Sequence, residues 1–168
     1  MAHKEWPDLY LVCEGEHDKN LLAALIRKIL QTEGIDRTVQ IVAAHGKQPI
    51  PKLIRALEYQ VPPDSVLGIV ADSDGDVEQT KSFLSKDLDL ARYLIIIAHP
   101  HLEAWFDEKA TIARQLSRSH EQAWKFVEGT DLNRVACEHP EFNTLLQTIT
   151  HTHSINGVVK QNHLASRL

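Results

Sequence analysis

The chain has 168 residues, of which 43% are hydrophobic and 24% are charged, and this composition excludes disordered, collagen-like and coiled-coil proteins. The 18 basic and 23 acidic side chains give a formal net charge of -5, which argues against a broadly basic surface that coats nucleic acid but is compatible with a local basic groove. No apolar run approaches the roughly 20 residues of a membrane span, so we expect no membrane association. One globular domain over residues 1–168 is the expected organisation.

The cysteines and the first residues indicate the compartment. Cys13 and Cys137 match neither the paired framework of a secreted domain nor a CxxC metal motif. No basic, apolar and small-residue leader opens the sequence. A reduced, cytoplasmic protein is the simplest interpretation.

Short apolar runs alternate with segments of helical periodicity over the first hundred residues. This alternation predicts an α/β fold, with a four-stranded, mainly parallel sheet between helices that are joined to it by right-handed crossovers. The run at 93–98 is the most apolar and is expected at the centre of the sheet. The predicted strands are residues 9–13, 39–43, 66–71 and 93–98, and the predicted helices between them are 17–34, 50–57 and 77–88.

The character of the sequence changes after Pro100, where no further convincing strand appears. No repeat, low-complexity tract or linker separates this part from the rest. We therefore expect a core over about residues 8–108 and a helical C-terminal extension over about residues 109–168, packed on the same sheet. The helical pieces are predicted at residues 102–107, 111–116, 121–127, 142–149 and 158–168.

Carboxylates gather where two of the predicted strands end. In a parallel sheet the carboxyl ends of the strands meet at one edge, which is where ligands bind. Like charges held close together repel strongly unless they share a cation or a proton, so a divalent cation is the economical explanation. Ligation by oxygen alone favours Mg²⁺ or Mn²⁺ over Zn²⁺. The residues concerned are Glu14 and Asp18 around Gly15, and Asp72, Asp74 and Asp76.

A helix-capping role and a calcium loop are two other interpretations of these acidic residues. Asp18 and Asp76 precede or open predicted helices, where a carboxylate serves as a cap. A calcium loop starting at Asp72 requires Gly at its sixth position and Glu at its twelfth, but the chain has Val77 and Phe83 there. The calcium-loop interpretation is therefore excluded, and the helix-cap interpretation stays open.

The segment Leu11-Val-Cys-Glu14-Gly15-Glu-His-Asp18, followed by Ile69-Val-Ala-Asp72-Ser-Asp74-Gly-Asp76, resembles the TOPRIM domain. In that family an apolar strand ends in Glu-Gly and a later strand ends in Asp-x-Asp, and the resemblance covers most of the first hundred residues. It implies a Rossmann-like fold and Mg²⁺-dependent chemistry on the phosphodiester bonds of DNA or RNA. Topoisomerases and primases carry further domains for which 168 residues leave little room. The chain is most similar to small stand-alone proteins related to the overcoming-lysogenization-defect nucleases, which are often linked to defence against phage.

Roles for individual residues follow from this resemblance. Glu14, Asp72 and Asp74, with Asp76, would hold one or two Mg²⁺, and Glu14 or Asp18 would also move protons. The resemblance further implies a carboxylate near the fourth strand, which Glu103 can supply as a metal ligand. It also implies a lysine late in the chain, and Lys160 can take this place as a catalytic residue. Lys47, at the end of the second strand, and Gly15 are the candidate phosphate-binding residues. A homodimer is also implied.

Two rival functions remain open at this stage. The first is a non-catalytic regulatory or binding module that depends on a protein partner such as an ATPase, which the net charge of -5 favours. The second is a zinc hydrolase that uses His99, His101 and Glu103, because alternate residues point the same way on an extended strand end. Pro100 interrupts that regularity.

Overall fold

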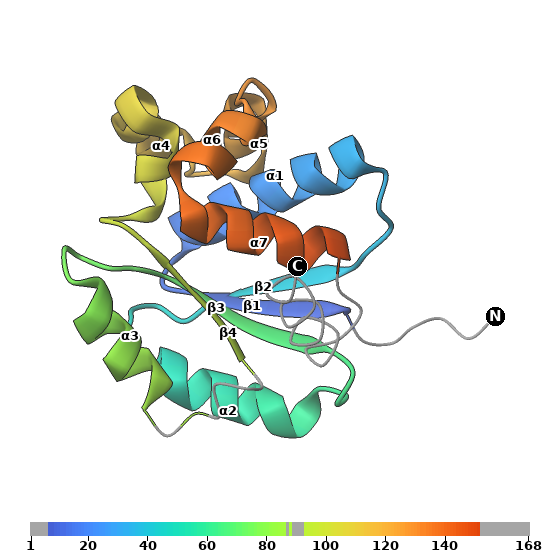
Figure 1. The fold of residues 1–168 in the computed structure, drawn as a ribbon, viewed down its shortest axis with the longest axis vertical. Helices are drawn as coiled ribbons and strands as arrows, with labels where there is room; N and C mark the ends of the chain where they lie inside the picture. Colours follow the sequence, from blue (N-terminus) through green and yellow to red (C-terminus); the bar gives the residue numbers. More distant parts are fainter. Residues whose placement is uncertain (1–6, 87, 89–92, 152–168) are drawn as a thin grey trace, which may run out of the picture.

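Four parallel strands form one sheet in the spatial order β2-β1-β3-β4 (Figure 1). The structure is a computed structural model, and it describes residues 7–86, 88 and 93–151. The strands are β1 (Leu9–Cys13), β2 (Val39–Ala43), β3 (Val66–Asp72) and β4 (Tyr93–Ala98). The helices are α1 (Glu16–Glu33), α2 (Ile50–Gln60), α3 (Val77–Ser85), the 3₁₀ helix η1 (Leu102–Lys109), α4 (Ala110–Leu116), α5 (His120–Glu128), α6 (Leu132–Glu138) and α7 (Pro140–His151).

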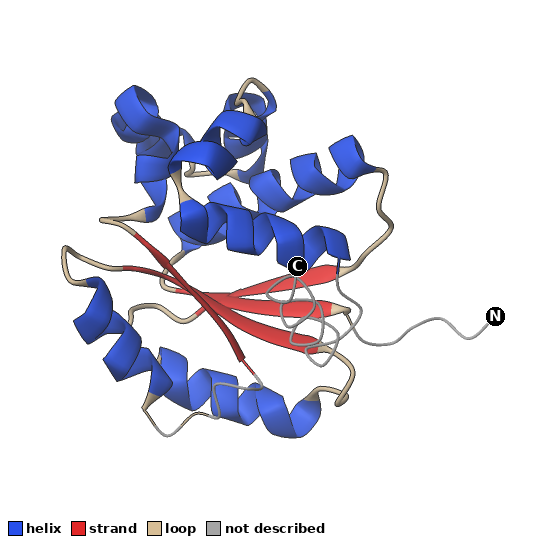
Figure 2. Cartoon of the chain, in the orientation of Figure 1, coloured by secondary structure: helices blue, strands red, loops and turns tan. Residues whose placement is uncertain are grey.

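Helices cover both faces of the sheet, as Figure 2 shows. Helices α2 and α3 lie on one face, and α1, α7 and the other C-terminal helices lie on the opposite face. All five residues of β1 are buried, and their side chains alternate between the two layers because successive residues of a strand point to opposite faces. Leu11 packs in the layer of α1 and α7, whereas Val12 packs in the layer of α2 and α3. Burial on both faces explains why the strands are continuous apolar runs.

Helix α1 positions the first part of the site, and its ends are set by glycines. It begins after Gly15 and ends at Gly34, which has a φ of 63° in the left-handed region and donates its backbone N–H to Leu30 O. Glycine adopts this conformation without the steric cost that a Cβ atom adds. The buried stripe along α1 then fixes which side of the helix faces the sheet, and so directs its first turn toward the end of β1.

The α/β class and the four-stranded sheet are confirmed, and the sheet is entirely parallel. The prediction that 93–98 lies at the centre is wrong, because β4 is an edge strand with β3 as its one neighbour in the described part of the chain. Strand β4 packs against α3 on one face and α7 on the other. The apolar sequence of β4 therefore reflects burial of both faces of the strand by helices and does not indicate a central position in the sheet.

The C-terminal helices agree with the sequence expectation in part. Helix α6 was not predicted, because only Leu132 and Val135 are buried in its seven residues and no periodicity is visible over so short a segment. Helix α3 ends at Ser85, three residues before the predicted end. The predicted helix at 158–168 lies outside the described residues. None of the described helices combines the length and the apolar character that crossing a bilayer requires.

Gly68, in the middle of β3, allows the close approach of its neighbour on β1. A Cβ atom at this position would lie 2.8 Å from Leu11 Cδ2, in a side chain that is fully buried. We expect Gly68→Ala to lower the free energy of unfolding by about 1–3 kcal/mol, because a packed core has no space for an added methyl group. Urea unfolding followed by tryptophan fluorescence measures the change.

Gly129→Ala is the matched control for this prediction. Gly129 has a φ of -86° and its nearest contact for a Cβ atom is 3.9 Å away, at Phe126 O. Alanine fits there without strain, so its effect is expected within about 0.5 kcal/mol. Equal stability of the two variants would contradict the close packing of β1 on β3.

Candidate metal centre at the carboxyl edge of the sheet

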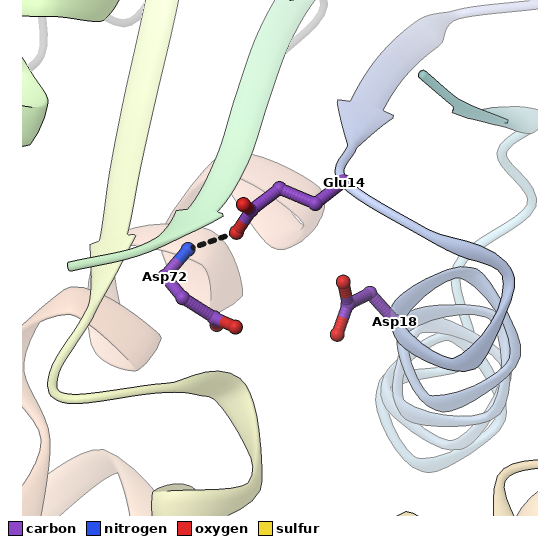
Figure 3. A group of neighbouring side chains, drawn as sticks. All are labelled: Glu14, Asp18 and Asp72. Carbon is purple, nitrogen blue, oxygen red and sulfur yellow. Dashed lines mark hydrogen bonds between the residues drawn. The ribbon is translucent and has the colours of Figure 1, made fainter. Parts of the chain in front are cut away.

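Three carboxylates converge at the carboxyl ends of the two central strands. Glu14 follows β1 directly, Asp18 lies in the first turn of α1, and Asp72 is the last residue of β3. One potential ligand atom from each lies within 4.8 Å of the other two. Figure 3 shows Glu14 extending toward β3 and the carboxylate of Asp18 facing the same space from α1. We call these three residues the acidic cluster.

Backbone N–H groups hold each carboxylate of the acidic cluster in place. Glu14 Oε2 accepts a hydrogen bond from the N–H of Asp72 at 2.8 Å. Asp72 Oδ1 accepts from the N–H of Leu102 at 2.7 Å, and Asp18 Oδ2 accepts from the N–H of Gly15 at 3.3 Å. Each carboxylate keeps a second oxygen outside these three bonds. The cluster is therefore preorganised and still has oxygen atoms with which to bind a cation.

The electrostatics of the acidic cluster favour a bound proton or a bound cation. Burial, followed by the negative charge of Asp18, raises the pKa of Asp72 from 3.8 to about 8. Burial, followed by the charges of Glu103 and Glu14, raises the pKa of Asp18 from 3.8 to about 6. Neighbouring carboxylates that are partly removed from water favour the neutral form unless a positive charge compensates them. A divalent cation would supply that charge.

Lys47 approaches the acidic cluster from the loop after β2. Its Nζ atom lies 2.5 Å from Asp74 Oδ2 and 4.0 Å from Glu14 Oε1. Asp74 reaches this position from a turn in which its own φ is 52° and that of Gly75 is 96°. Lys47 and Asp74 thus form an ion pair beside the cluster. The predicted phosphate-binding lysine is at the correct edge of the sheet, but its charge is already shared with carboxylates.

The acidic cluster opens into a cleft with a volume of about 600 Å³. Two of its three members line the cleft, and η1 and α4 supply further side chains from the C-terminal part of the chain. Sequence reasoning missed His17, Thr111 and Arg114. Thr111 and Arg114 reach the cleft only through tertiary packing, in which Ser117 joins the end of α4 to α1. The lining residues are Gly15, His17, Asp18, Asp72, Asp74, His101, Glu103, Thr111 and Arg114.

The other predicted site residues have distinct environments. Glu103 lines the cleft, is 9% exposed and influences the pKa of both aspartates, but it is not a member of the three-ligand group. Asp76 is the N-cap of α3 and accepts a hydrogen bond from the N–H of Gln79 at 2.9 Å, which is the helix-cap interpretation. Asp18 is both a member of the acidic cluster and a helix cap, since its side chain accepts a hydrogen bond from the N–H of Gly15 at the start of α1. Lys160 lies outside the described residues.

The histidines near β4 do not converge as the zinc hypothesis requires. His99 Nδ1 lies 2.7 Å from Ser73 Oγ, and the half-exposed His101 has its Nδ1 3.5 Å from Glu103 Oε2. Among residues 7–86, 88 and 93–151, the acidic cluster is the only group that brings three metal-ligating atoms within 4.8 Å of one another. The thiol of Cys13 is also unsuited to ligation, because burial raises its pKa to about 12 and keeps it protonated.

The fold and the site together define an α/β protein of the Rossmann-like type with an acidic cluster at the carboxyl edge of a parallel sheet. Comparison of the sequence with protein-family models and with curated proteins finds no match.

Asp72→Asn is expected to stabilise the protein without bound metal, and to do so increasingly as the pH rises. Folding raises the pKa of Asp72 from 3.8 to about 8. The protonated carboxyl of Asp72 therefore stabilises the folded protein fully at pH values below 3.8, and this contribution is lost as the pH rises through about 8. Asparagine still accepts the Leu102 hydrogen bond. We expect the free energy of unfolding of the variant to exceed that of the wild type by on the order of 2 kcal/mol at about pH 9 and to equal it near about pH 4.

Urea unfolding in EDTA across this pH range tests the prediction, with Asp131→Asn as a control for the loss of a carboxylate outside the cleft. Asp131 caps α6, and asparagine is an equally good cap. A difference between Asp72→Asn and the wild type that stays constant with pH would contradict the assigned environment of Asp72.

Proposed function

We propose that this protein is a TOPRIM-like nuclease that hydrolyses phosphodiester bonds of DNA or RNA with Mg²⁺ or Mn²⁺ bound at the acidic cluster. The observation that carries the proposal is the convergence of Glu14, Asp18 and Asp72 at the carboxyl ends of adjacent strands. The residues are those that carry the sequence resemblance to TOPRIM domains. A set of three carboxylates fits a hard divalent cation, and a cation would compensate the negative charge that the raised pKa values of Asp18 and Asp72 disfavour.

The residues divide the expected chemistry between them. Glu14 and Asp72 would hold the cation, because each is fixed by a backbone N–H through one oxygen and keeps the other oxygen available. When bound, the cation would supply charge for a phosphoryl oxygen and lower the pKa of a bound water. Asp18, with a pKa raised to about 6, is suited to accept a proton from the attacking water near neutral pH. Glu103 adds a buried negative charge that favours cation binding.

The size and charge of the cleft are consistent with a nucleic-acid substrate that contacts the protein over a short length. A volume of about 600 Å³ is typical of sites for small ligands and is enough for the nucleotides next to the bond that is cut. The net charge of -5 makes tight binding to long duplexes by the chain alone unfavourable. Delivery of the substrate by a protein partner, such as an ATPase, or by a second copy of the chain would compensate for this.

Incubation with labelled single- and double-stranded DNA and RNA tests the proposal. We expect cleavage of at least one substrate with Mg²⁺ or Mn²⁺ and none with EDTA. Glu14→Gln and Asp72→Asn should each lower the rate by at least about 100-fold, because a metal ligand supports several kcal/mol of transition-state stabilisation. Asp131→Asn, outside the cleft, should cleave like the wild type.

Calorimetry with Mg²⁺ alone separates the rival functions. The wild type should bind Mg²⁺, and both site variants should bind it weakly. Folded protein that binds Mg²⁺ yet cleaves none of the substrates would contradict the nuclease and favour a partner-dependent binding module. Cleavage that persists in EDTA would contradict the metal site itself.

A further inference from the structure

Arg114 is a positively charged residue of the cleft whose guanidinium has no partner among the described residues. It lies on α4, far from the acidic cluster in sequence, and it is the only Lys or Arg among the described residues that line the cleft. Lys47, by contrast, is paired with Asp74 and lies near Glu14. No described residue forms an ion pair or a hydrogen bond with the Arg114 guanidinium, a group that carries five N–H donors.

A buried polar network fixes the backbone of Arg114 relative to the acidic cluster. Ser117, which follows α4 directly, is fully buried, and its Oγ donates a hydrogen bond to Arg114 O at 2.9 Å. The buried side chain of Asn20 donates to Ser117 O at 2.7 Å, and His17 Nδ1 lies 3.2 Å from Ser117 Oγ. Both Asn20 and His17 belong to α1, the helix that carries Asp18. The network therefore ties the end of α4 to the first turns of α1.

Most charged side chains that line the cleft are acidic, so an anionic ligand would need a compensating positive charge. Asp18, Asp72, Asp74 and Glu103 line the cleft and would repel an anionic substrate. The positive charge of Arg114 already acts on this region, since it lowers the pKa of Asp18 against the larger effects of burial and of Glu103 and Glu14. A guanidinium is planar and matches two oxygens of a phosphate, so it binds phosphate strongly and with a defined orientation.

We propose that Arg114 binds a non-bridging phosphate oxygen of the nucleic-acid strand that occupies the cleft. This inference rests on the proposed function, because it takes the phosphodiester to be the ligand of the acidic cluster. It assigns to the helical C-terminal region a direct contact with the substrate. The acidic cluster comes from the strand ends of the sheet and the first turn of α1, whereas the phosphate-binding cation comes from α4. Ser117 joins α4 to α1, the helix that carries Asp18.

Equilibrium binding of a fluorescein-labelled single-stranded DNA of about 12 nucleotides tests the inference, because phosphate contacts do not depend on sequence. Anisotropy is measured with Ca²⁺ in place of Mg²⁺, with a gel to verify that the probe stays intact. Arg114→Ala should weaken binding by about tenfold or more, because a charge-assisted hydrogen bond is lost. It should also reduce the slope of log affinity against log salt by about 0.7, the value for one phosphate contact on a single strand.

Arg118→Ala is the matched control, since Arg118 is exposed, four residues further on and not among the cleft residues. It should leave the affinity within about twofold and the salt slope unchanged. Arg114→Lys should restore part of the affinity, and Arg114→Gln, which keeps most of the side chain, should behave like Arg114→Ala. Mg²⁺ binding measured by calorimetry should be retained in all four variants. A merely structural role for Arg114 would not change the salt slope by one phosphate contact.

The outcomes separate this inference from the proposed function. Binding that depends on Arg114, without cleavage of any nucleic acid, would support the phosphate contact and contradict the nuclease. Cleavage that depends on Glu14 and Asp72, with Arg114→Ala equal to Arg118→Ala in both affinity and kcat/KM, would overturn the role of Arg114 alone. Failure of the wild type to bind the probe at any salt concentration would also overturn it.

Discussion

The hydrogen bond from the backbone N–H of Asp72 to Glu14 Oε2 is the contact on which the site depends. It joins the ends of β1 and β3, the two central strands, and holds two carboxylates close together although their negative charges repel one another. Burial, together with the charges of neighbouring carboxylates, raises the pKa values of Asp72 and Asp18. Packing on both faces of the sheet supplies the free energy that maintains the arrangement, because the strand ends cannot separate without exposing the apolar core.

The positions of the cluster residues follow from the pairing of adjacent parallel strands. Strands β1 and β3 run side by side, and Gly68 of β3 leaves space for the side chain of Leu11 of β1. Their carboxyl ends therefore meet, and the residue after β1 faces the last residue of β3. Glu14 and Asp72 were predictable from sequence for this reason. Asp18 was also predictable, because a helix that follows Gly15 must present its first turn to the same edge.

Other parts of the site were beyond sequence reasoning, because they depend on tertiary placement. The sequence left open whether Asp76 is a metal ligand or a helix cap, and the structure places it as the N-cap of α3. The apolar content of β4 could not distinguish an edge strand from a central one, since helices bury both faces in either case. Arg114 has no recognisable motif around it, and its place at the cleft depends on the packing of α4 against η1 and α5 and on the contact of Ser117 with α1.

Proton and metal binding are coupled at such a site, and this coupling shapes its response to pH. Because Asp72 and Asp18 hold protons more tightly than isolated aspartates, a cation that binds there must displace them in part. If the acidic cluster binds Mg²⁺ as proposed, the affinity would therefore rise with pH until the pKa of Asp72 is passed. The hydrogen bonds from Leu102 and Gly15 persist through this exchange, because carboxyl and carboxylate oxygens both accept them. The backbone can thus keep the ligand geometry while the compensating charge changes from protons to a metal ion.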